Sequence, residues 1–349
     1  MMSENQENRK KSSSGIPTII KILGIIGIIV FWYFVFYGPM PSGNLTPRTQ
    51  EGNYSMMVSD HLNISEIALD IQADVGRYDI KLLPQGSQNL LDADWDLNYK
   101  IGEDAEHDIE ISISNTTINN TLSILVSVLH PSGEFIIIDN FNFTLYLNPD
   151  YALYGLNAEL AAGSLEIDAN NITYNEFSVS TNAGEININL DSIDIQSDLY
   201  VDNNAGEIDI SLNNVTIDGD FSTDNNAGAT YIDITDMKFA NNAIMDINSD
   251  AGEIDLLWEQ TVSLGADLIM NVDNNVGETD IDIVATDLLM KYQVALDTDV
   301  GSEDFNHDEW EFDSGYYQSN EFSDSLADLM QINANADVGA LDIDIALQS

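Results

Sequence analysis

The chain has 349 residues, with 10 Lys+Arg against 60 Asp+Glu, which gives a formal net charge of −50. A negative field of this size repels nucleic acid, so DNA and RNA are excluded as partners. The absence of cysteine excludes disulfides, thiolate metal sites and cysteine catalysis. A hydrophobic content of 44% is sufficient for a packed core.

The amino-terminal region predicts a membrane anchor. Residues 1–15 are polar and contain Arg9, Lys10 and Lys11. Residues 16–37 form an apolar run in which Lys21 is the single charged residue. A run of about 20 apolar residues spans a bilayer as a helix, and basic residues stay on the cytoplasmic side. We therefore expect a single-pass membrane protein with a cytoplasmic tail 1–15, a transmembrane helix 16–37 and residues 38–349 outside the cytoplasm. A cleaved signal peptide is the weaker alternative, because no small-x-small cleavage site follows the run.

The next two regions are less regular. Residues 38–57 are rich in Pro and Gly and predict a stalk, and residues 58–150 predict an irregular β cap with a first rung. Glycosylation outside the membrane is suggested by Asn-x-Ser/Thr sequons, although some arise by chance in a chain rich in Asn, Ser and Thr. The sequons begin at Asn44, Asn53, Asn63, Asn115, Asn119, Asn142, Asn171 and Asn214.

A repeat dominates residues 151–349. A polar turn with glycine is followed by alternating apolar and acidic residues, as in 204–210, Asn-Ala-Gly-Glu-Ile-Asp-Ile. Period-two alternation indicates strands, and a near-constant interval of 21 to 25 residues between glycines indicates a β-solenoid. An ordinary β-sandwich would lack the repeated corner motif. The glycines are Gly163, Gly184, Gly206, Gly228, Gly252, Gly277 and Gly301, with a last copy at Gly339.

The longer interval before Gly339 predicts a loop insertion at 302–324. Its aromatic residues stand among acids, where aromatic rings can stack on sugars or dock a partner protein. We therefore take Trp310, Phe312, Tyr316 and Tyr317 as candidate partner contacts. The alternative is that these rings pack back onto the repeat.

The repeat resembles the putative adhesin family of bacterial and archaeal β-solenoid proteins, in the Asn-Ala-Gly-Glu-Ile-Asp-Ile copies and in the terminal segment 337–343, Asp-Val-Gly-Ala-Leu-Asp-Ile. The resemblance covers roughly residues 58–349. It implies a right-handed single-stranded β-helix at the cell surface, and it supplies no catalytic residues.

Outward positions of the repeat predict a row of acids. Oxygen ligands without nitrogen or sulfur favour a hard cation, so we expect weak, diffuse Ca²⁺ binding and no other cofactor. The alternative is a solvated acidic face that confers solubility. The candidate ligands are Glu166, Asp209, Asp233, Asp255, Asp280 and Asp342.

These observations predict a non-catalytic protein with a structural or adhesive role at the cell surface, in contact with surface glycans or proteins. One alternative is a Ca²⁺-dependent glycan-binding or envelope-scaffold module. Another is a carbohydrate-active enzyme on a β-helix, which needs only two carboxylates. We do not expect an enzyme, because the repeat has no arginine and one histidine, His307, from which to assemble a catalytic base and an oxyanion stabiliser.

Overall fold

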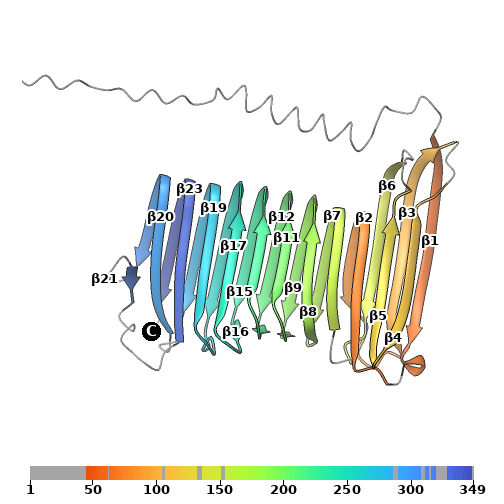
Figure 1. Cartoon of the computed structure of the whole chain (residues 1–349), viewed down its shortest axis with the longest axis horizontal. Coiled ribbons are helices and arrows are strands. Elements are labelled where there is room, and N and C mark those ends of the chain that lie inside the picture. Colours follow the sequence, from red (N-terminus) through yellow and green to blue (C-terminus); the bar gives the residue numbers. More distant parts are fainter. Residues whose placement is uncertain are drawn as a thin grey trace, which may run out of the picture.

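The computed structural model describes residues 45–61, 63–103, 107–131, 136–150, 154–285, 290–307, 311–313, 316–319 and 328–347. This part of the chain is all β apart from a single 3-10 turn, η1 (Val58–Asp60), which confirms the all-β prediction. The strands lie side by side along one long axis (Figure 1).

The predicted anchor lies outside this region. Residues 1–15 and 16–37 are not among the described residues, and within the described ranges no helix is long and apolar enough to cross a membrane. The expected localisation, a single-pass membrane protein with residues 38–349 outside the cytoplasm, is corrected by this finding, and we assign no membrane span.

Each repeat forms one coil with a first side before the glycine corner and a second side after it. In the middle coils the first side is β8 (Thr173–Thr181), β11 (Leu199–Asn203), β14 (Phe221–Asn225) and β17 (Ala243–Ser249). The second side is β9 (Gly184–Asp191), β12 (Gly206–Asn213), β15 (Gly228–Thr235) and β18 (Gly252–Gln260). Short strands close the coil: β10 (Asp194–Ile195), β13 (Thr216–Ile217) and β16 (Lys238–Phe239).

In the other coils a single strand runs through both sides. These strands are β2 (Glu66–Leu82), β7 (Tyr154–Asn170), β19 (Leu268–Ala285), β20 (Met290–His307) and β23 (Asp328–Leu347).

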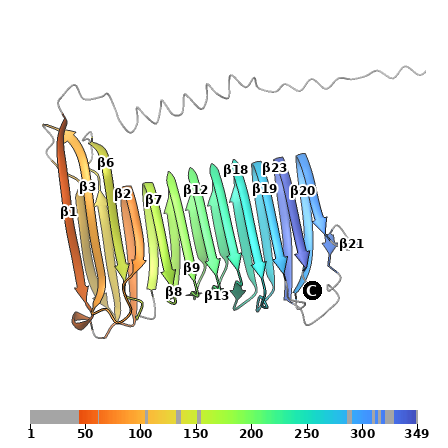
Figure 2. The same ribbon diagram turned by 180° about the vertical axis from the view of Figure 1, so that it is seen from behind.

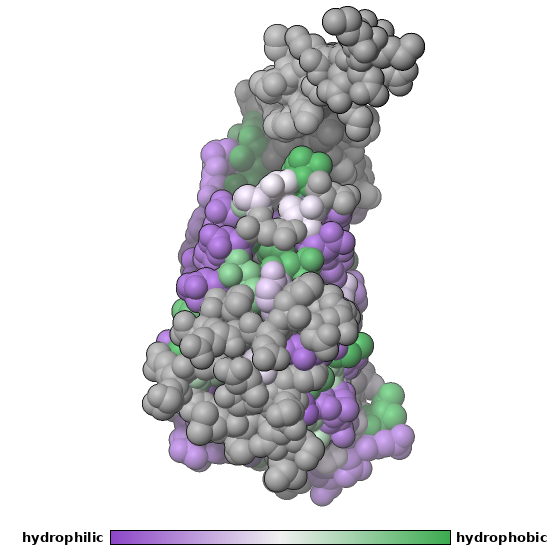
Figure 3. Space-filling view, turned by 90° about the vertical axis from the view of Figure 1, so that its left-hand side faces the viewer, coloured by the Kyte–Doolittle hydropathy of each residue, from purple (hydrophilic) through white to green (hydrophobic). Residues whose placement is uncertain are grey.

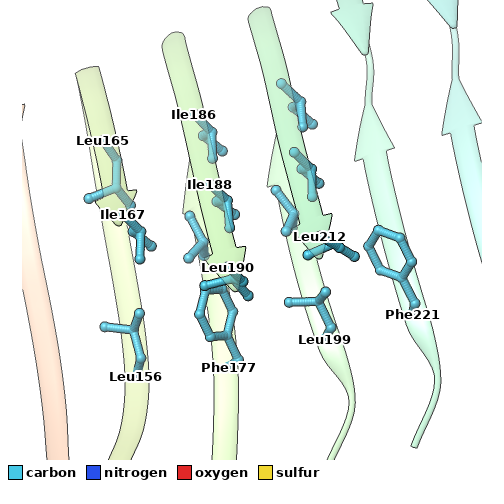
Figure 4. Close-up of a cluster of buried hydrophobic side chains, with 14 of the residues drawn as sticks. Leu156, Leu165, Ile167, Phe177, Ile186, Ile188, Leu190, Leu199, Leu212 and Phe221 are labelled. Carbon is cyan, nitrogen blue, oxygen red and sulfur yellow. The ribbon is translucent and has the colours of Figure 1, made fainter. Parts of the chain in front are cut away.

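Consecutive coils pair as parallel strands in register with the glycine motif. Gly206 of β12 lies beside Gly184 of β9 and beside Gly228 of β15. Alternation then sends one set of side chains inward, and Ile208 and Ile210 are completely buried. Their counterparts in neighbouring coils lie over one another to form a continuous core (Figure 4).

The glycine corners allow the coils to approach closely. Gly206 has φ +141°, and a Cβ atom built on it would lie 1.8 Å from the carbonyl oxygen of Gly184. The buried amide of Asn203 supports this corner, because its Nδ2 donates to the carbonyl oxygens of Gly184 (3.0 Å) and Glu207 (3.3 Å). Asn225 makes the equivalent bonds one coil further on, to Gly206 (3.2 Å) and Ala229 (2.9 Å). A single corner design therefore repeats along the stack.

Antiparallel strands close the amino-terminal end. β5 (Thr121–Leu129) and β6 (Ile136–Leu147) continue the parallel stack beyond β2. β4 (Glu110–Ile118) and β3 (Asn89–Gly102) then pair antiparallel with them, and β1 (Leu45–Met57) pairs with β3. Most of the segment that we expected to be a stalk is thus the outermost strand of this end.

The other end differs from the expected chain order. β23, the last strand of the chain, pairs with β19 on one edge and with β20 on the other, and no ladder of the described strands joins β19 to β20 (Figures 1 and 2). The insertion forms the small hairpin β21 (Glu311–Asp313) and β22 (Tyr316–Gln318), which contacts β20, and residues 302–307 belong to β20 itself. The last copy of the repeat in the sequence, at Gly339, is therefore not the last strand of the stack.

The sequence supplies a physical reason for this order. The register places Glu303 of β20 beside Leu341 of β23, and His307 beside Ile345. Leu341 and Ile345 are buried between two coils. A strand with Glu and His at these positions would place ionisable groups inside the stack, at a cost of several kcal/mol for an unpaired charge. The apolar C-terminal strand takes the inner place, and β20 takes the end.

Candidate functional site

Two outward rows of carboxylates lie on the second side near the β20 end. In the first row, Asp255 of β18, Asp280 of β19, Asp342 of β23 and Asp304 of β20 occupy successive strands in register. In the second row, Asp282 lies beside Asp344. All six side chains are exposed, and we call them the acidic face: Asp255, Asp280, Asp282, Asp304, Asp342 and Asp344.

Local sequence places these side chains outward. Asp280-Ile281-Asp282-Ile283 and Asp342-Ile343-Asp344-Ile345 alternate strictly, and each isoleucine is buried in the core. Because alternate residues of a strand point to opposite faces, burying the isoleucines fixes both aspartates on the outer surface. Adjacent strands are about 4.8 Å apart, so like charges face each other along each row.

Electrostatics at the acidic face disfavour full ionisation. Partial burial against the neighbouring strands, followed by the charges of Asp282 and Asp342, raises the pKa of Asp280. Partial burial, followed by the charge of Asp344, likewise raises the pKa of Asp282. Each pair of adjacent charges costs about 1 kcal/mol in a water-like dielectric. The face therefore favours protons or mobile cations close to it.

In the described part of the repeat, the cationic residues are Lys238 of β16 and Lys291 of β20. The other described cations form ion pairs at the opposite end of the stack, and they are Arg48, Arg77, Lys81 and Lys100. The nearest of these to the repeat is Arg77, which bridges Asp79 (3.0 Å) and Glu166 (2.5 Å).

The predicted row of acids is interrupted. Glu166 is neutralised by Arg77, and Asp209 lies between Asn187 and Tyr231 in register. Asp233 was assigned to the wrong row, because Gly228 aligns with Gly206 and brings Tyr231 to the expected position. Asp233 instead lies in the second row, between Ser211 and Leu257. The structure therefore brings together only Asp255, Asp280 and Asp342 of the six predicted ligands.

These carboxylates do not form a coordination shell. Across the described ranges, no group of three or more His, Asp or Glu side chains is arranged to hold a metal ion. Ca²⁺ takes six to eight oxygen ligands around it, whereas a straight row presents oxygens from one side only. The arrangement can concentrate cations near the surface, with their remaining ligands supplied by water or by a bound partner.

One of the predicted aromatic contacts can be placed, and it lies at the same end of the stack. Trp310 is outside the described residues, and the side chains of Phe312 and Tyr316, in β21 and β22, are likewise not described. Tyr317 is half-buried, and its ring lies 4.8 Å from that of Phe305 on β20. For Tyr317, this contact supports the interpretation that the rings pack back onto the repeat, and not the interpretation that they wait for a partner. The end view shows hydrophilic and hydrophobic residues together around this region (Figure 3).

A second surface feature lies on the first side near the cap. A hollow of about 450 Å³ has small residues on its floor, Ala68, Ser123 and Gly155. Its carboxylate Asp70 accepts hydrogen bonds from the amides of Gln72 (3.1 Å) and Asn157 (3.3 Å). The hollow offers polar hydrogen-bonding groups on a shallow surface.

Comparison with known proteins gives no assignment. No protein-family model matches the sequence. No curated protein matches it either. The chain is similar to the solved structure of a putative adhesin from Bacteroides fragilis, with 12% identity, a TM-score of 0.36, and coverage of 87% of this chain and 98% of that one.

Two further solved structures share this low similarity. A putative cell adhesion protein from Clostridium sporogenes has 10% identity and a TM-score of 0.25, and the match covers 85% of this chain and 100% of that one. A putative adhesin from Parabacteroides distasonis has 11% identity and a TM-score of 0.26, and the match covers 87% and 98%. These scores are too low to establish a family or a function for this chain.

Sequence reasoning missed the second row of the acidic face. Asp282 and Asp344 were not proposed as sites, because only one outward position was followed along the copies. The strict alternation Asp-Ile-Asp-Ile in both segments was the available signal, since it places two acids of each strand on the same surface.

Proposed function

We propose that this protein is a non-catalytic structural or adhesive β-solenoid, a right-handed single-stranded β-helix that acts at the cell surface. The observation that carries the proposal is the acidic face: one in-register row of exposed carboxylates across four successive strands, with a second row across two of them. Such rows offer many equivalent weak contacts at fixed spacing, and linked weak contacts add up to strong attachment.

Cations give the acidic face a means of attachment. Cell surfaces and acidic glycans carry negative charge, and they are repelled by a protein with a net charge of −50. A hard divalent cation held weakly between the rows and a surface carboxylate would reverse this repulsion. We therefore retain weak Ca²⁺ binding in the proposal, with the bridging ion shared between the protein and a surface glycan or protein.

Aromatic residues of the segment between β20 and β23 extend the proposed contact. Phe312 lies in β21 and Tyr316 in β22, the hairpin that pairs with β20, and Trp310 is included from its place in the sequence alone. Aromatic rings add apolar contact area beside a charged surface. The proposed contact region is therefore the acidic face together with these three aromatic residues.

The test measures attachment of the full chain to cells and to immobilised acidic and neutral glycans, with Ca²⁺ or with a chelator. We compare the wild type with the quadruple variant Asp280→Asn, Asp282→Asn, Asp342→Asn, Asp344→Asn. The matched control removes four exposed charges elsewhere: Glu110→Gln, Glu159→Gln, Asp194→Asn and Asp218→Asn.

We expect attachment that needs Ca²⁺, is lost in the acidic-face variant and is kept in the control. An equal loss of attachment in both variants would show that net charge, not the acidic face, is responsible, and full attachment by both would show that these carboxylates are not needed. Hydrolysis of any of the glycans by the wild type would contradict the non-catalytic role.

A further inference from the structure

The C-terminal strand β23 fills a slot between two strands that do not pair with each other. Met330–Leu347 lies in register against β19, and Asp328–Ile345 lies in register against β20. Both views of the molecule show β23 between β19 and β20 (Figures 1 and 2). Removing β23 would therefore leave two unpaired strand edges facing each other, and such edges pair readily with another strand.

The slot selects its occupant by shape. A Cβ atom on Gly339 would lie 1.6 Å from the carbonyl oxygen of Gly277, and a Cβ atom on Gly301 would lie 1.7 Å from that of Gly339. The occupant must therefore have glycine at this position, and its own corner must leave room for the next glycine. Only a strand with a correctly placed glycine corner enters the slot without separating the coils.

The slot also selects by apolar pattern. Ile332, Ile343 and Ile345 of β23 are buried, and their register partners in β19 are Met270, Ile281 and Ile283, which are also buried. A shift of one residue would turn this whole set toward solvent. Segment 328–347 meets the glycine and apolar requirements together and lies at the end of the chain, and every copy of this chain carries it.

We propose that the slot between β19 and β20 is a strand-exchange site, in which the C-terminal strand of a second copy replaces the chain's own. Reciprocal exchange reproduces every contact of β23 in a dimer, so its main cost is the entropy of association. The two stacks of the dimer are then joined at their β20 ends.

The connection between the strands permits exchange. β22 is held on β20 by backbone bonding of Ser319 to Tyr292 (3.1 Å) and by the contact of Tyr317 with Phe305. Eight residues, 320–327, then lead from Ser319 to the start of β23 at Asp328. Eight extended residues reach at most about 30 Å, which is enough to cross to a molecule packed against the same end.

Because the chain contains no cysteine, a disulfide can form only between cysteines that are introduced for a crosslinking test. Asp282 of β19 and Asp344 of β23 are adjacent in register and exposed, so cysteines at these positions can form a disulfide between the two strands. The full chain with Asp282→Cys is mixed at high concentration with a size-tagged full chain with Asp344→Cys. Urea below the unfolding midpoint is added to release β23 from the slot. The mixture is then diluted so that β23 can pair again, and it is oxidised so that adjacent cysteines form a disulfide.

The control pair is Asn189→Cys and Ser211→Cys, which occupy the same outward row in the middle of the stack, where no chain end is available to exchange. We expect a mixed disulfide dimer from the end pair and only the background of random collisions from the middle pair. A mixed dimer no more abundant than the control would overturn strand exchange.

A single chain carrying both Asp282→Cys and Asp344→Cys provides the second measurement. It should close an internal disulfide when it is oxidised at low concentration, since its own strand then fills the slot. Failure to close, with an unfolding midpoint like that of the wild type, would show that β23 does not lie beside β19 and would also overturn the proposal.

Discussion

Replacement of one corner glycine tests whether the coils are packed as closely as their backbones suggest. We choose Gly206→Ala in the middle of the stack, where φ is +141° and the nearest atoms are the carbonyl oxygen (1.8 Å) and carbonyl carbon (2.7 Å) of Gly184. Both belong to the backbone, so no side-chain rotation can relieve the contact. Ordinary contact begins at 3.4 Å, so the coils would have to separate by roughly 1.6 Å.

That separation sets the expected magnitude. The backbone bonds Gly184 N–H to Ala205 O (2.8 Å) and Asn204 N–H to Thr181 O (3.0 Å) join these two coils, and the displacement would take both beyond hydrogen-bonding distance. Loss of two such bonds costs about 1 kcal/mol each, and a non-glycine residue at this φ costs about 1–3 kcal/mol more. We expect Gly206→Ala to lower the free energy of unfolding by about 4 kcal/mol.

Two other glycines separate the contributions. Gly86 has φ +78° but no atom near its Cβ position, so Gly86→Ala should cost about 1–2 kcal/mol from the backbone alone. Gly102 has neither a left-handed φ nor a close neighbour, so Gly102→Ala should be neutral within about 1 kcal/mol. Urea unfolding followed by circular dichroism gives the three values. If Gly206→Ala costs no more than Gly86→Ala, the close approach of the coils is not what requires glycine.

Two further predictions concern charge and buried amides. The raised pKa values of Asp280 and Asp282 mean that the folded state binds more protons than the unfolded state just above their ordinary value of 3.8, so stability falls as pH rises through that window. The melting temperature of the wild type should therefore be higher at about pH 4.5 than at pH 7. The double variant Asp280→Asn, Asp282→Asn should lose much of this difference. A difference as large as that of the wild type would show that other groups cause the pH dependence. Asn225 is buried and donates to two carbonyl oxygens, whereas its neighbour Asn226 is only partly buried and donates to the side chain of Asn204. Asn225→Ala should cost about 1–3 kcal/mol in urea unfolding and Asn226→Ala less than about 0.5 kcal/mol, and equal costs would contradict a supporting role for the buried amide.

Local patterns were sufficient to predict the repeating unit. Alternation at Ile208 and Ile210 fixes the buried side of a strand, and the spacing of Gly184, Gly206 and Gly228 fixes the register between strands. The buried Asn203 was not anticipated as a structural residue, because its role depends on the carbonyl of the preceding coil. That carbonyl is distant in sequence and is defined only once the coils are stacked.

To predict the order of the last coils, the residues that follow the glycine corner must be compared from one strand to the next. The three copies at Gly277, Gly301 and Gly339 have equivalent corners, so glycine spacing alone cannot rank them. The ranking comes from the residues after each corner, where Leu341 and Ile345 suit an inner strand and Glu303 and His307 suit an outer one. Chain order is a weaker constraint than the cost of enclosing a charge. Four residues separate the end of β19 from the start of β20, which lies two strand positions away, and 20 residues separate the end of β20 from the start of β23 in the place between them.

The acidic face differs from the other outward rows because its stacked side chains are carboxylates without amides between them. A repeat places similar side chains over one another, and amides turn this into a ladder: Asn204 donates to Asn182 (2.8 Å), and Asn271 donates to Asp246 (2.7 Å).

In the row from Asp255 to Asp304, by contrast, carboxylate faces carboxylate without an amide donor at any of the four positions. Asparagine at alternate positions would relieve that repulsion within the same fold, as it does for Asp273 beside Asn335 (3.1 Å). Four aspartates in succession are therefore not required by the fold. Solubility needs exposed charge but no unbroken row, whereas an external cation or a cation-bridged partner would use the row, and this is why we propose the acidic face as the place of attachment.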